Sequence, residues 1–149
     1  MANNAINWES NPSLTSYLTT ELNSLANGGN KLGAAIDNSA GLDMYMDVEI
    51  NIAEQGSARS AGAYVAVYLV PSADGGTNYA YGADALTPGA NHLVATVPFD
   101  AAVTARIQLA TMMPAPPGHF KLLVQNATGQ ALAASANTFS YRLYSAELQ

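Results

Sequence analysis

The chain contains no cysteine and few charged residues. Without cysteine, disulfides, thiolate nucleophiles and thiolate metal ligands are all excluded. A small extracellular protein of cellular origin often carries a disulfide, whereas a chain made in a cytosol and held together by its core and partners needs none. Charged residues make up only 11% of the chain, about half the usual share. Asn, Ser, Thr, Gln and Gly must therefore supply most of the polar surface, and such a surface suits packing against another protein.

Basic residues are especially scarce. The five Lys and Arg residues lie singly along the chain, and the net charge is −6. Proteins that track phosphates need several cations on one surface, because counterion release supplies most of their affinity. We therefore expect no binding to nucleic acid and none to an anionic membrane surface. The N-terminus lacks the basic and apolar regions of a signal peptide, and no apolar run approaches the ~20 residues that span a bilayer.

What the chain does have is a repeated alternation of apolar and polar residues from Asp43 to the C-terminus. A period of two is typical of a strand with one buried and one solvated face. In the first such segment, Asp47, Glu49 and Asn51 share the polar face. The apolar face carries Met44, Met46, Val48, Ile50 and Ile52. Hydrophobic residues make up 49% of the 149 residues, which is enough for one domain with a real core.

The same alternation predicts several further strands. The segment 63–71 is apolar on both faces, which is typical of a central strand covered on both sides. Because no helices separate the predicted strands, a parallel sheet is disfavoured. The sequence predicts an all-β protein with six to eight antiparallel strands in a sandwich or barrel. These strands are expected over 43–54, 63–71, 92–98, 103–112, 119–126 and 138–144, with a short strand within 31–37.

One amphipathic helix is predicted before the strands. Pro12 suits the first helical position after a cap at Ser10 or Asn11, and Gly28-Gly29 can end the helix. Its apolar residues follow helical spacing. They are Leu14, Tyr17, Leu18, Leu22 and Leu25. We therefore expect a single domain over residues 1–149, with an N-terminal arm at 1–10, a helix at 11–27 and a β-sandwich at 31–149.

The titratable residues do not form a recognisable catalytic motif. His92 and His119 could bind zinc together with a carboxylate, or perform acid–base chemistry. Nothing in their spacing brings them together, and we interpret both as ordinary strand-end residues. Asp47 and Glu49, near Asp43, could act as paired carboxylates in glycoside hydrolysis, but the solvated face of an exposed strand is the preferred interpretation. We therefore predict no enzyme activity, no metal and no cofactor.

Four other features resemble known sites only in part. The segment 74–78 could bind calcium, but it lacks the ligand spacing of an EF-hand and is interpreted as a tight turn. Ser60 lies in a segment close to a nucleophile elbow, but no helix follows it. Asn126 begins a glycosylation sequon, which carries no weight without a signal peptide. Tyr79 and Tyr81 alternate within a long loop and could stack on a sugar ring.

The N-terminal arm contains a candidate interface. Ile6 and Trp8 are large apolar residues in an otherwise polar segment, and such residues are normally retained by burial. A buried Trp is among the commonest anchors at interfaces. We therefore predict that Ile6 and Trp8 contact a partner or a neighbouring protomer, with Tyr79 and Tyr81 as further interface candidates. The other interpretation is that Trp8 folds back over one end of the sandwich.

Three segments together resemble a known class of protein. They are residues 13–25 (SLTSYLTTELNSL), 62–71 (GAYVAVYLVP) and 117–126 (PGHFKLLVQN). The combination resembles the small structural proteins of tailed-bacteriophage virions that decorate or cement the capsid. The resemblance implies a jelly-roll-like β-sandwich, commonly a homotrimer, bound to the outside of the shell formed by the major capsid protein. It has no diagnostic motif, so no family site residue carries over.

Two functions are therefore predicted. The first is a non-enzymatic structural protein on the capsid surface of a virion, made in the host cytoplasm, that bridges neighbouring subunits by adding buried contact area. The alternative is a receptor- or glycan-binding module of a phage tail, with an aromatic platform at Tyr79 and Tyr81. A small hydrolase would need a cleft with converging titratable groups, and the chain offers few such groups.

Overall fold

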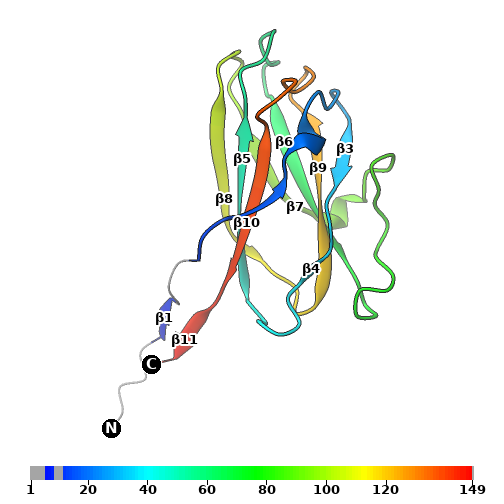
Figure 1. The fold of residues 1–149 in the computed structure, drawn as a ribbon, viewed down its shortest axis with the longest axis vertical. Coiled ribbons are helices and arrows are strands. Elements are labelled where there is room, and N and C mark those ends of the chain that lie inside the picture. Colours follow the sequence, from blue (N-terminus) through cyan, green and yellow to red (C-terminus); the bar gives the residue numbers. More distant parts are fainter. Residues whose placement is uncertain (1–5, 9–11, 149) are drawn as a thin grey trace.

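The structure is a computed structural model that describes residues 6–8 and 12–148, with side chains from residue 12 to residue 146. Within these residues the regular structure is almost entirely β (Figure 1). The strands are β1 (Ile6–Trp8), β2 (Thr15–Leu18), β3 (Asn30–Leu32), β4 (Ile36–Asp37), β5 (Tyr45–Ile52), β6 (Tyr64–Pro71), β7 (Leu93–Pro98), β8 (Arg106–Pro114), β9 (His119–Ala127), β10 (Thr138–Tyr144) and β11 (Ala146–Leu148). Two short 3₁₀ turns are η1 (Thr20–Leu22) and η2 (Ala90–His92).

Two antiparallel sheets pack face to face, as the sequence predicts for an all-β sandwich. One sheet has the strand order β2-β10-β5-β8 and the other β3-β9-β6-β7, with β4 also paired to β9. We call them the β5 sheet and the β6 sheet. A separate two-stranded ribbon, β1 with β11, projects from one end of the sandwich (Figure 1). The first and the last strand of the described part therefore lie together outside the body.

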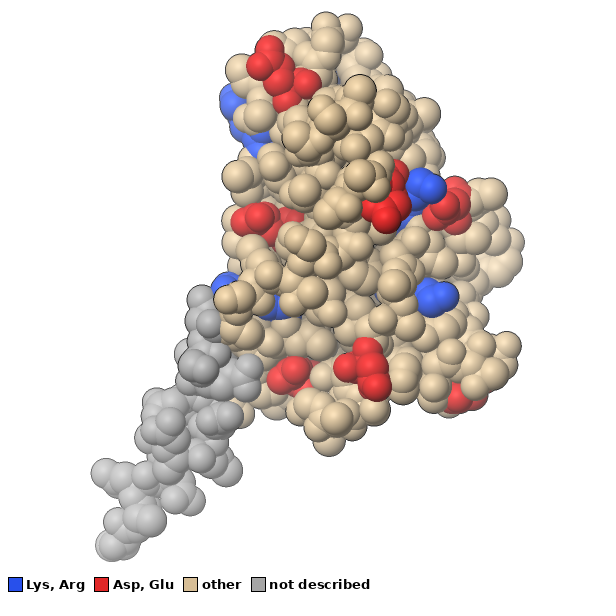
Figure 2. All heavy atoms as spheres, in the orientation of Figure 1, with Lys and Arg blue, Asp and Glu red and all other residues tan. Residues whose placement is uncertain are grey.

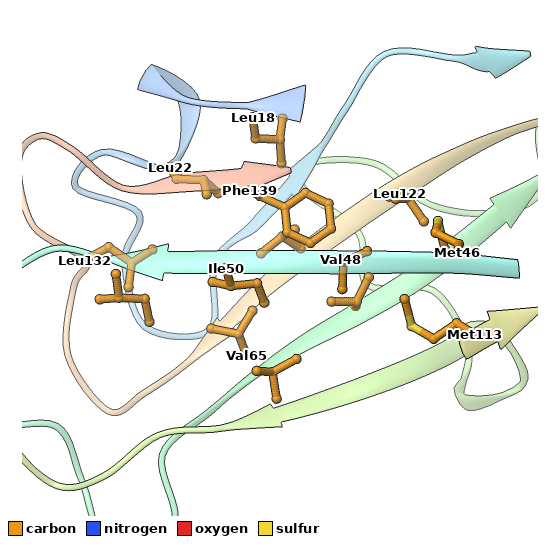
Figure 3. Close-up of a cluster of buried hydrophobic side chains, with 14 of the residues drawn as sticks. Leu18, Leu22, Met46, Val48, Ile50, Val65, Met113, Leu122, Leu132 and Phe139 are labelled. Atoms are coloured by element: carbon orange, nitrogen blue, oxygen red, sulfur yellow. The ribbon is translucent and has the colours of Figure 1, made fainter. Parts of the chain in front are cut away.

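The core lies between the two sheets and follows the predicted alternation. The inward face of β5 is buried from Met46 to Ile52, whereas Met44, which precedes the strand, is 55% exposed. These side chains meet those of the facing β6 sheet and of β10 (Figure 3). Fully buried side chains of the facing sheet include Val65, Val67, Phe120 and Leu122, and Phe139 of the neighbouring strand β10 is also fully buried.

Strand β6 confirms the prediction of a central strand covered on both sides. Its inward residues Val65 and Val67 belong to the main core. Its outward residues form a second apolar cluster with Leu123 of β9, against which Tyr79 of the long loop 72–89 packs. The outward residues are Ala66, Tyr68 and Val70. The loop thus covers an outer face that would otherwise expose apolar side chains to water.

The predicted helix at 11–27 is wrong. Residues 15–18 form β2, which pairs with β10, and only the single turn η1 is helical. Leu18 and Leu22 are both buried in the core, because a strand followed by a tight turn also brings residues four apart to one side. The β-branched residues Thr15, Thr19 and Thr20 weaken helix propensity. Pairing with β10 and burial of two leucines then decide the conformation, since tertiary context overrides local propensity.

Tyr17 of β2 connects the two sheets along the side where β2 lies near β3 and β4. Its hydroxyl accepts a hydrogen bond from the Leu122 amide (3.0 Å) and donates one to the Ala34 carbonyl. Burial raises the pKa of Tyr17 to about 12. Gly33 makes room for the ring, because a Cβ at this position would lie 2.0 Å from Tyr17 Cε1.

Buried polar side chains hold the loops at the ends of the sandwich. Each member of this group is at most 2% exposed and bonds to a segment distant in the sequence. The group comprises Asn38, Arg59, Asn126 and Asn137. The Arg59 guanidinium, for example, donates to the carbonyls of Asp100 and Thr104 at 3.0 Å each. Every buried side-chain nitrogen or oxygen in the described part has a hydrogen-bond partner.

Candidate interaction surface

The two histidines bond to different groups. His92 ends η2, and its Nδ1 lies 3.1 Å from the Leu69 carbonyl oxygen. His119 begins β9, and its Nε2 lies 3.4 Å from Asp37 Oδ2. Both therefore lie at strand ends, as predicted. Among residues 12–146, no group of three His, Cys, Asp or Glu side chains is placed to hold a metal ion.

Asp47 is buried, which corrects the prediction that it lies on a solvated face. Although it is on the outer face of β5, it is only 3% exposed. Its carboxylate accepts hydrogen bonds from the Met112 amide (2.9 Å), from Arg142 Nη2 (2.6 Å) and from the Tyr144 hydroxyl (2.8 Å). Burial alone would raise the pKa of Asp47, but these hydrogen bonds outweigh it and hold the pKa below its usual value. Both carboxylate oxygens are thus engaged by the protein itself.

The Met112 amide reaches Asp47 because β8 contains a β-bulge there. The register of β8 on β5 shifts between Met46 and Val48, so residues 111 and 112 both lie opposite Asp47. Met112 has a left-handed backbone (φ +58°) and is 57% exposed. This conformation favours Gly or Asn over a large apolar residue. Such backbone strain is concentrated at functional sites in proteins, which directs attention to this surface.

An apolar row lies on the outer face of the β5 sheet. Ile107 and Leu109, two residues apart on β8, are 59% and 52% exposed. They lie opposite Asn51 and Glu49 of β5, and Met112 extends the row towards the bulge. Because β8 is the last strand of its sheet, the row borders a strand edge. The sequence analysis missed this row, since alternation shows which residues share a face but not whether anything covers that face.

The predicted aromatic pair is divided between two environments. Tyr79 is partly buried, and Lys121 Nζ lies 4.2 Å from the centre of its ring. Tyr81 is 66% exposed. A shallow hollow of about 390 Å³ lies beside Tyr79 and is lined by residues 71–74 and 78–80. As interface candidates, both tyrosines stay predictions.

The segment 74–78 forms a turn, as predicted. The Asp74 carboxylate accepts hydrogen bonds from the Asn78 backbone amide (2.8 Å), from the Asn78 side chain (2.6 Å) and from the Ser72 hydroxyl (2.8 Å). These hydrogen bonds lower the pKa of Asp74 to about 2. The turn also uses Gly75 and Gly76, which both have positive φ.

The other two sequence features have structural surroundings that explain them. Ser60 lies exposed in the loop between β5 and β6, where its backbone amide bonds to the Thr128 carbonyl (2.9 Å). Asn126 is fully buried, and its side-chain amide donates to the carbonyls of Leu25 (2.9 Å) and Gln130 (2.8 Å). The amide nitrogen that would carry a glycan is therefore inside the folded protein.

The β1–β11 ribbon contains the other two predicted interface residues. Its backbone register pairs Ile6 with Leu148 and Trp8 with Ala146. The side chains of Ile6 and Trp8 lie outside the described part of the chain, so their role as interface residues stays a prediction. The ribbon itself projects beyond the body of the sandwich (Figure 1). Two strands alone are marginally stable in water, so a ribbon of this kind needs a surface on which to pack.

Charge is spread thinly over the molecule, and the face shown in Figure 2 is mostly uncharged. Four of the five cations have a carboxylate partner, and Lys121 lies over Tyr79. Arg59 and Arg106 share the single carboxylate of Asp100. No helix in the described part is long and apolar enough to cross a membrane.

Comparisons with protein families, with curated proteins and with solved structures find nothing that matches this chain. The function must therefore be inferred from the geometry of the chain itself. That geometry presents two surfaces suited to binding, which are the projecting ribbon and the apolar row of β8.

Proposed function

We propose that this protein is a non-enzymatic structural protein that binds the outer surface of a phage capsid and bridges neighbouring subunits. The observation that carries the proposal is the projecting β1–β11 ribbon, which extends beyond the body of the sandwich and can link the protein to a capsid subunit or to a neighbouring protomer bound beside it (Figure 1). The apolar row of Ile107, Leu109 and Met112 gives the same body a second contact surface. The capsid as the target comes from the resemblance of three sequence segments to capsid-decorating proteins.

We also propose that the sandwich is a jelly roll. The pairing pattern supports this, because β2 pairs with β10, β3 with β9, β5 with β8 and β6 with β7, always antiparallel. These pairs are nested in chain order, with β6 and β7 innermost, so they are the pairs that one long hairpin of the chain would form. When that hairpin is wrapped into two layers, β10 meets β5 and β9 meets β6, as they do here. Jelly rolls occur in viral capsid and lectin domains, so the fold suits the main proposal and its alternative alike.

The mechanism is adhesive. An interface of standard size buries ~800 Å² on each partner, which is about a tenth of the 7659 Å² surface of this chain. A surface rich in amides and hydroxyls loses less on desolvation than a charged one. Self-association as a trimer, as the resemblance implies, would let several copies bind together and would add avidity. The protein would then resist separation of capsid subunits by adding contact area across their boundaries.

Co-sedimentation tests the proposal. The full-length protein is mixed separately with intact capsids and with isolated tails of the virion that carries it. We expect it to pellet with capsids and not with tails. A Trp8→Ala variant should lose capsid binding, either directly or through loss of the oligomer and its avidity, whereas Tyr64→Ala, at an exposed tyrosine outside the interface candidates, should keep it. Binding to tails alone would favour the alternative function, and binding to neither particle would remove the proposal.

The alternative, a receptor- or glycan-binding module of a phage tail, is supported by the hollow beside Tyr79. A sugar ring commonly stacks on an exposed aromatic face, but here Lys121 lies over one face of Tyr79 and the ring packs against the apolar cluster of the β6 sheet. We therefore rank this function second. Calorimetric titration with neutral oligosaccharides, with Tyr79→Ala as the control, would reveal it through binding that the variant loses.

A further inference from the structure

We propose that the β1–β11 ribbon of one protomer packs on the edge and outer face of β8 in a second copy of this chain. The inference rests on the self-association proposed above, but not on the capsid as a target. It names the two surfaces that meet, and it assigns a role to the apolar row of β8.

Of the two surfaces, the ribbon is less stable than β8 in the absence of a partner. Its two strands pair with each other and lie outside both sheets (Figure 1). Two strands of this length gain too little free energy from pairing with each other alone to stay ordered in water. A surface that offers both backbone hydrogen bonds and apolar contact would stabilise it, and a strand edge beside an apolar row offers both.

Strand β8 is the longest of the four strands that end the two sheets. Edge strands expose backbone groups that readily pair with another strand, and proteins protect most such edges. Strand β2 has four residues and β3 has three. The edge of β3 is also capped, because Asp84 Oδ1 accepts a hydrogen bond from the Leu32 amide (2.7 Å). Strand β7 stops at Pro98 after six residues, whereas β8 has nine residues. The bulge at residues 111 and 112 lies in the second half of β8 and leaves the first part of the strand regular.

The chemistry of the two surfaces is complementary. Residues 107–111 of β8 are uncharged, and Ile107 and Leu109 are more than half exposed. At the start of β8, the exposed Arg106 is paired with the exposed Asp100, and the side chain of Arg59, which shares this carboxylate, is buried. The ribbon strands contain one charged residue in sequence, Glu147, and are otherwise uncharged. The match is therefore one of apolar residues in the ribbon strands with the apolar, uncharged first part of β8, and Glu49 of β5, which lies opposite Leu109, is the acidic group beside the contact.

The contact joins two different surfaces of the same chain. Each protomer would then give its ribbon to one neighbour and receive a ribbon from another. Contacts of this kind close into rings when the rotation between copies allows it, which is compatible with the proposed trimer. A two-fold pairing of β8 with β8 would cover the edges but would leave both ribbons without a surface.

The absence of cysteine makes a cross-linking test clean. Asn7→Cys in the ribbon and Leu109→Cys on β8 are introduced into separate full-length chains, which are mixed and treated with a short bismaleimide. We expect the mixed cross-link between positions 7 and 109 to be the main product. Leu93→Cys serves as the matched control, because Leu93 is also exposed (41%) and begins the edge strand of the other sheet. It should cross-link to Asn7→Cys at least about tenfold less.

Sedimentation of full-length variants gives an independent readout. Leu109→Lys should weaken self-association at least about tenfold, which corresponds to ~1.4 kcal/mol, while Leu93→Lys should leave it unchanged. If Leu109→Cys alone gives the main product, β8 pairs with β8 and the inference is wrong. Equal cross-linking of position 7 to positions 93 and 109 would also overturn it. If the chain is monomeric at every concentration, self-association itself fails, whereas an oligomer without the 7–109 product removes only this inference.

Discussion

The two outer faces of the sandwich differ in whether the chain itself covers them. On the β6 sheet, loop 72–89 folds over the apolar cluster that contains Tyr68 and Leu123, so the face is covered by the chain itself. On the β5 sheet, no equivalent loop covers β8 within the described residues, and Ile107 and Leu109 are exposed. The first face contributes to the stability of the monomer. The second contributes little to it and is available to another molecule.

The same contrast applies to polar groups. Loop 72–89 is tied to β3 by Asp84, which binds the Leu32 amide and the Lys31 ammonium at 2.7 Å each. On the β5 sheet, the buried Asp47 instead ties together the bulge of β8 and the end of β10, which leads into the ribbon. Asp84 thus protects an edge, whereas Asp47 shapes an edge that stays open. Substitutions at Asp47 and Asp84 separate these roles.

The largest expected effect is that of Asp47→Ala. It leaves the Met112 amide, the Arg142 guanidinium and the Tyr144 hydroxyl without their acceptor, and removing one partner of a buried ion pair costs roughly 3–5 kcal/mol. We expect a loss of about 3 kcal/mol, because Arg142 is 21% exposed and can still reach water. Glu49→Ala, two residues along the same face, is the control and should cost under ~0.5 kcal/mol. Equal losses in urea unfolding would contradict the assignment.

Leu123→Ala should have the next largest effect. Leu123 lies on the outer face of the β6 sheet, yet it is fully buried beneath the loop. Truncation of a buried leucine costs roughly 2–5 kcal/mol, and we expect the lower part of that range because the covering loop can settle into the space. Chemical unfolding measures the loss. A cost under ~0.5 kcal/mol would show that the loop does not cover this face.

Gly33→Ala tests the connection between the sheets. The new methyl group would overlap the Tyr17 ring, so the ring must move and release the Leu122 amide from its hydroxyl. We expect about 2 kcal/mol of destabilisation from overpacking and the lost hydrogen bond. Gly56→Ala is the control, because a Cβ there has nothing within 4 Å. If the two variants melt at the same temperature, Tyr17 does not depend on Gly33.

Asp84→Asn should loosen the covering loop. Hydrogen bonds from the Leu32 amide and from Lys31 lower the pKa of Asp84. The stabilisation is therefore present above the ordinary carboxyl pKa and is lost as the pH falls through the lowered value. Because the carboxylate is half exposed, we expect only ~0.5–1 kcal/mol. After correction for the intrinsic pH dependence of amide exchange, the protection factors of loop 72–89 should fall with acidification in the native protein but change less in the variant. Identical pH profiles would exclude this role.

The smallest expected effect is that of Leu109→Ala, measured at concentrations where the protein is monomeric. Leu109 is exposed on the uncovered outer face of the β5 sheet, so the substitution should change the free energy of unfolding by less than ~0.5 kcal/mol. Its comparison with Leu123→Ala is the sharpest test of the difference between the two faces, since both residues are outward-facing leucines. A cost similar to that of Leu123→Ala would mean that part of the chain covers β8.

The positions of the strands were predictable because the signal is local. The alternation in 43–52 and 138–144 depends only on neighbouring residues, and residues 45–52 and 138–144 are strands; in the first, the apolar side from Met46 to Ile52 is buried as expected, whereas Met44 and Asp47 depart from the pattern. The segment 11–27 was mispredicted because Leu18 and Leu22 fit a helix and a strand-plus-turn equally well. Pairing of β2 with β10, more than a hundred residues away, selects the second.

The candidate surface was less predictable than the fold. Ile6 and Trp8 were singled out by residue type alone, and the structure adds that their strand pairs with the C-terminal segment. Ile107 and Leu109 attracted no attention, because an apolar residue in a strand is normally assumed to face the core. The burial of Asp47 was also missed, since its donors come from β8 and β10.

The amino-acid pattern alone predicted an all-β protein with antiparallel strands, and the composition shows that the chain has no cysteine and only five Lys and Arg residues, which are spaced singly. These properties follow from composition and from a period of two, which are local quantities. The three-dimensional fold sets which outer face is covered, where β8 bulges around Asp47, and how β1 pairs with β11 in a projecting ribbon. Each of these depends on contacts between segments far apart in the chain, whose free energy no single segment contains.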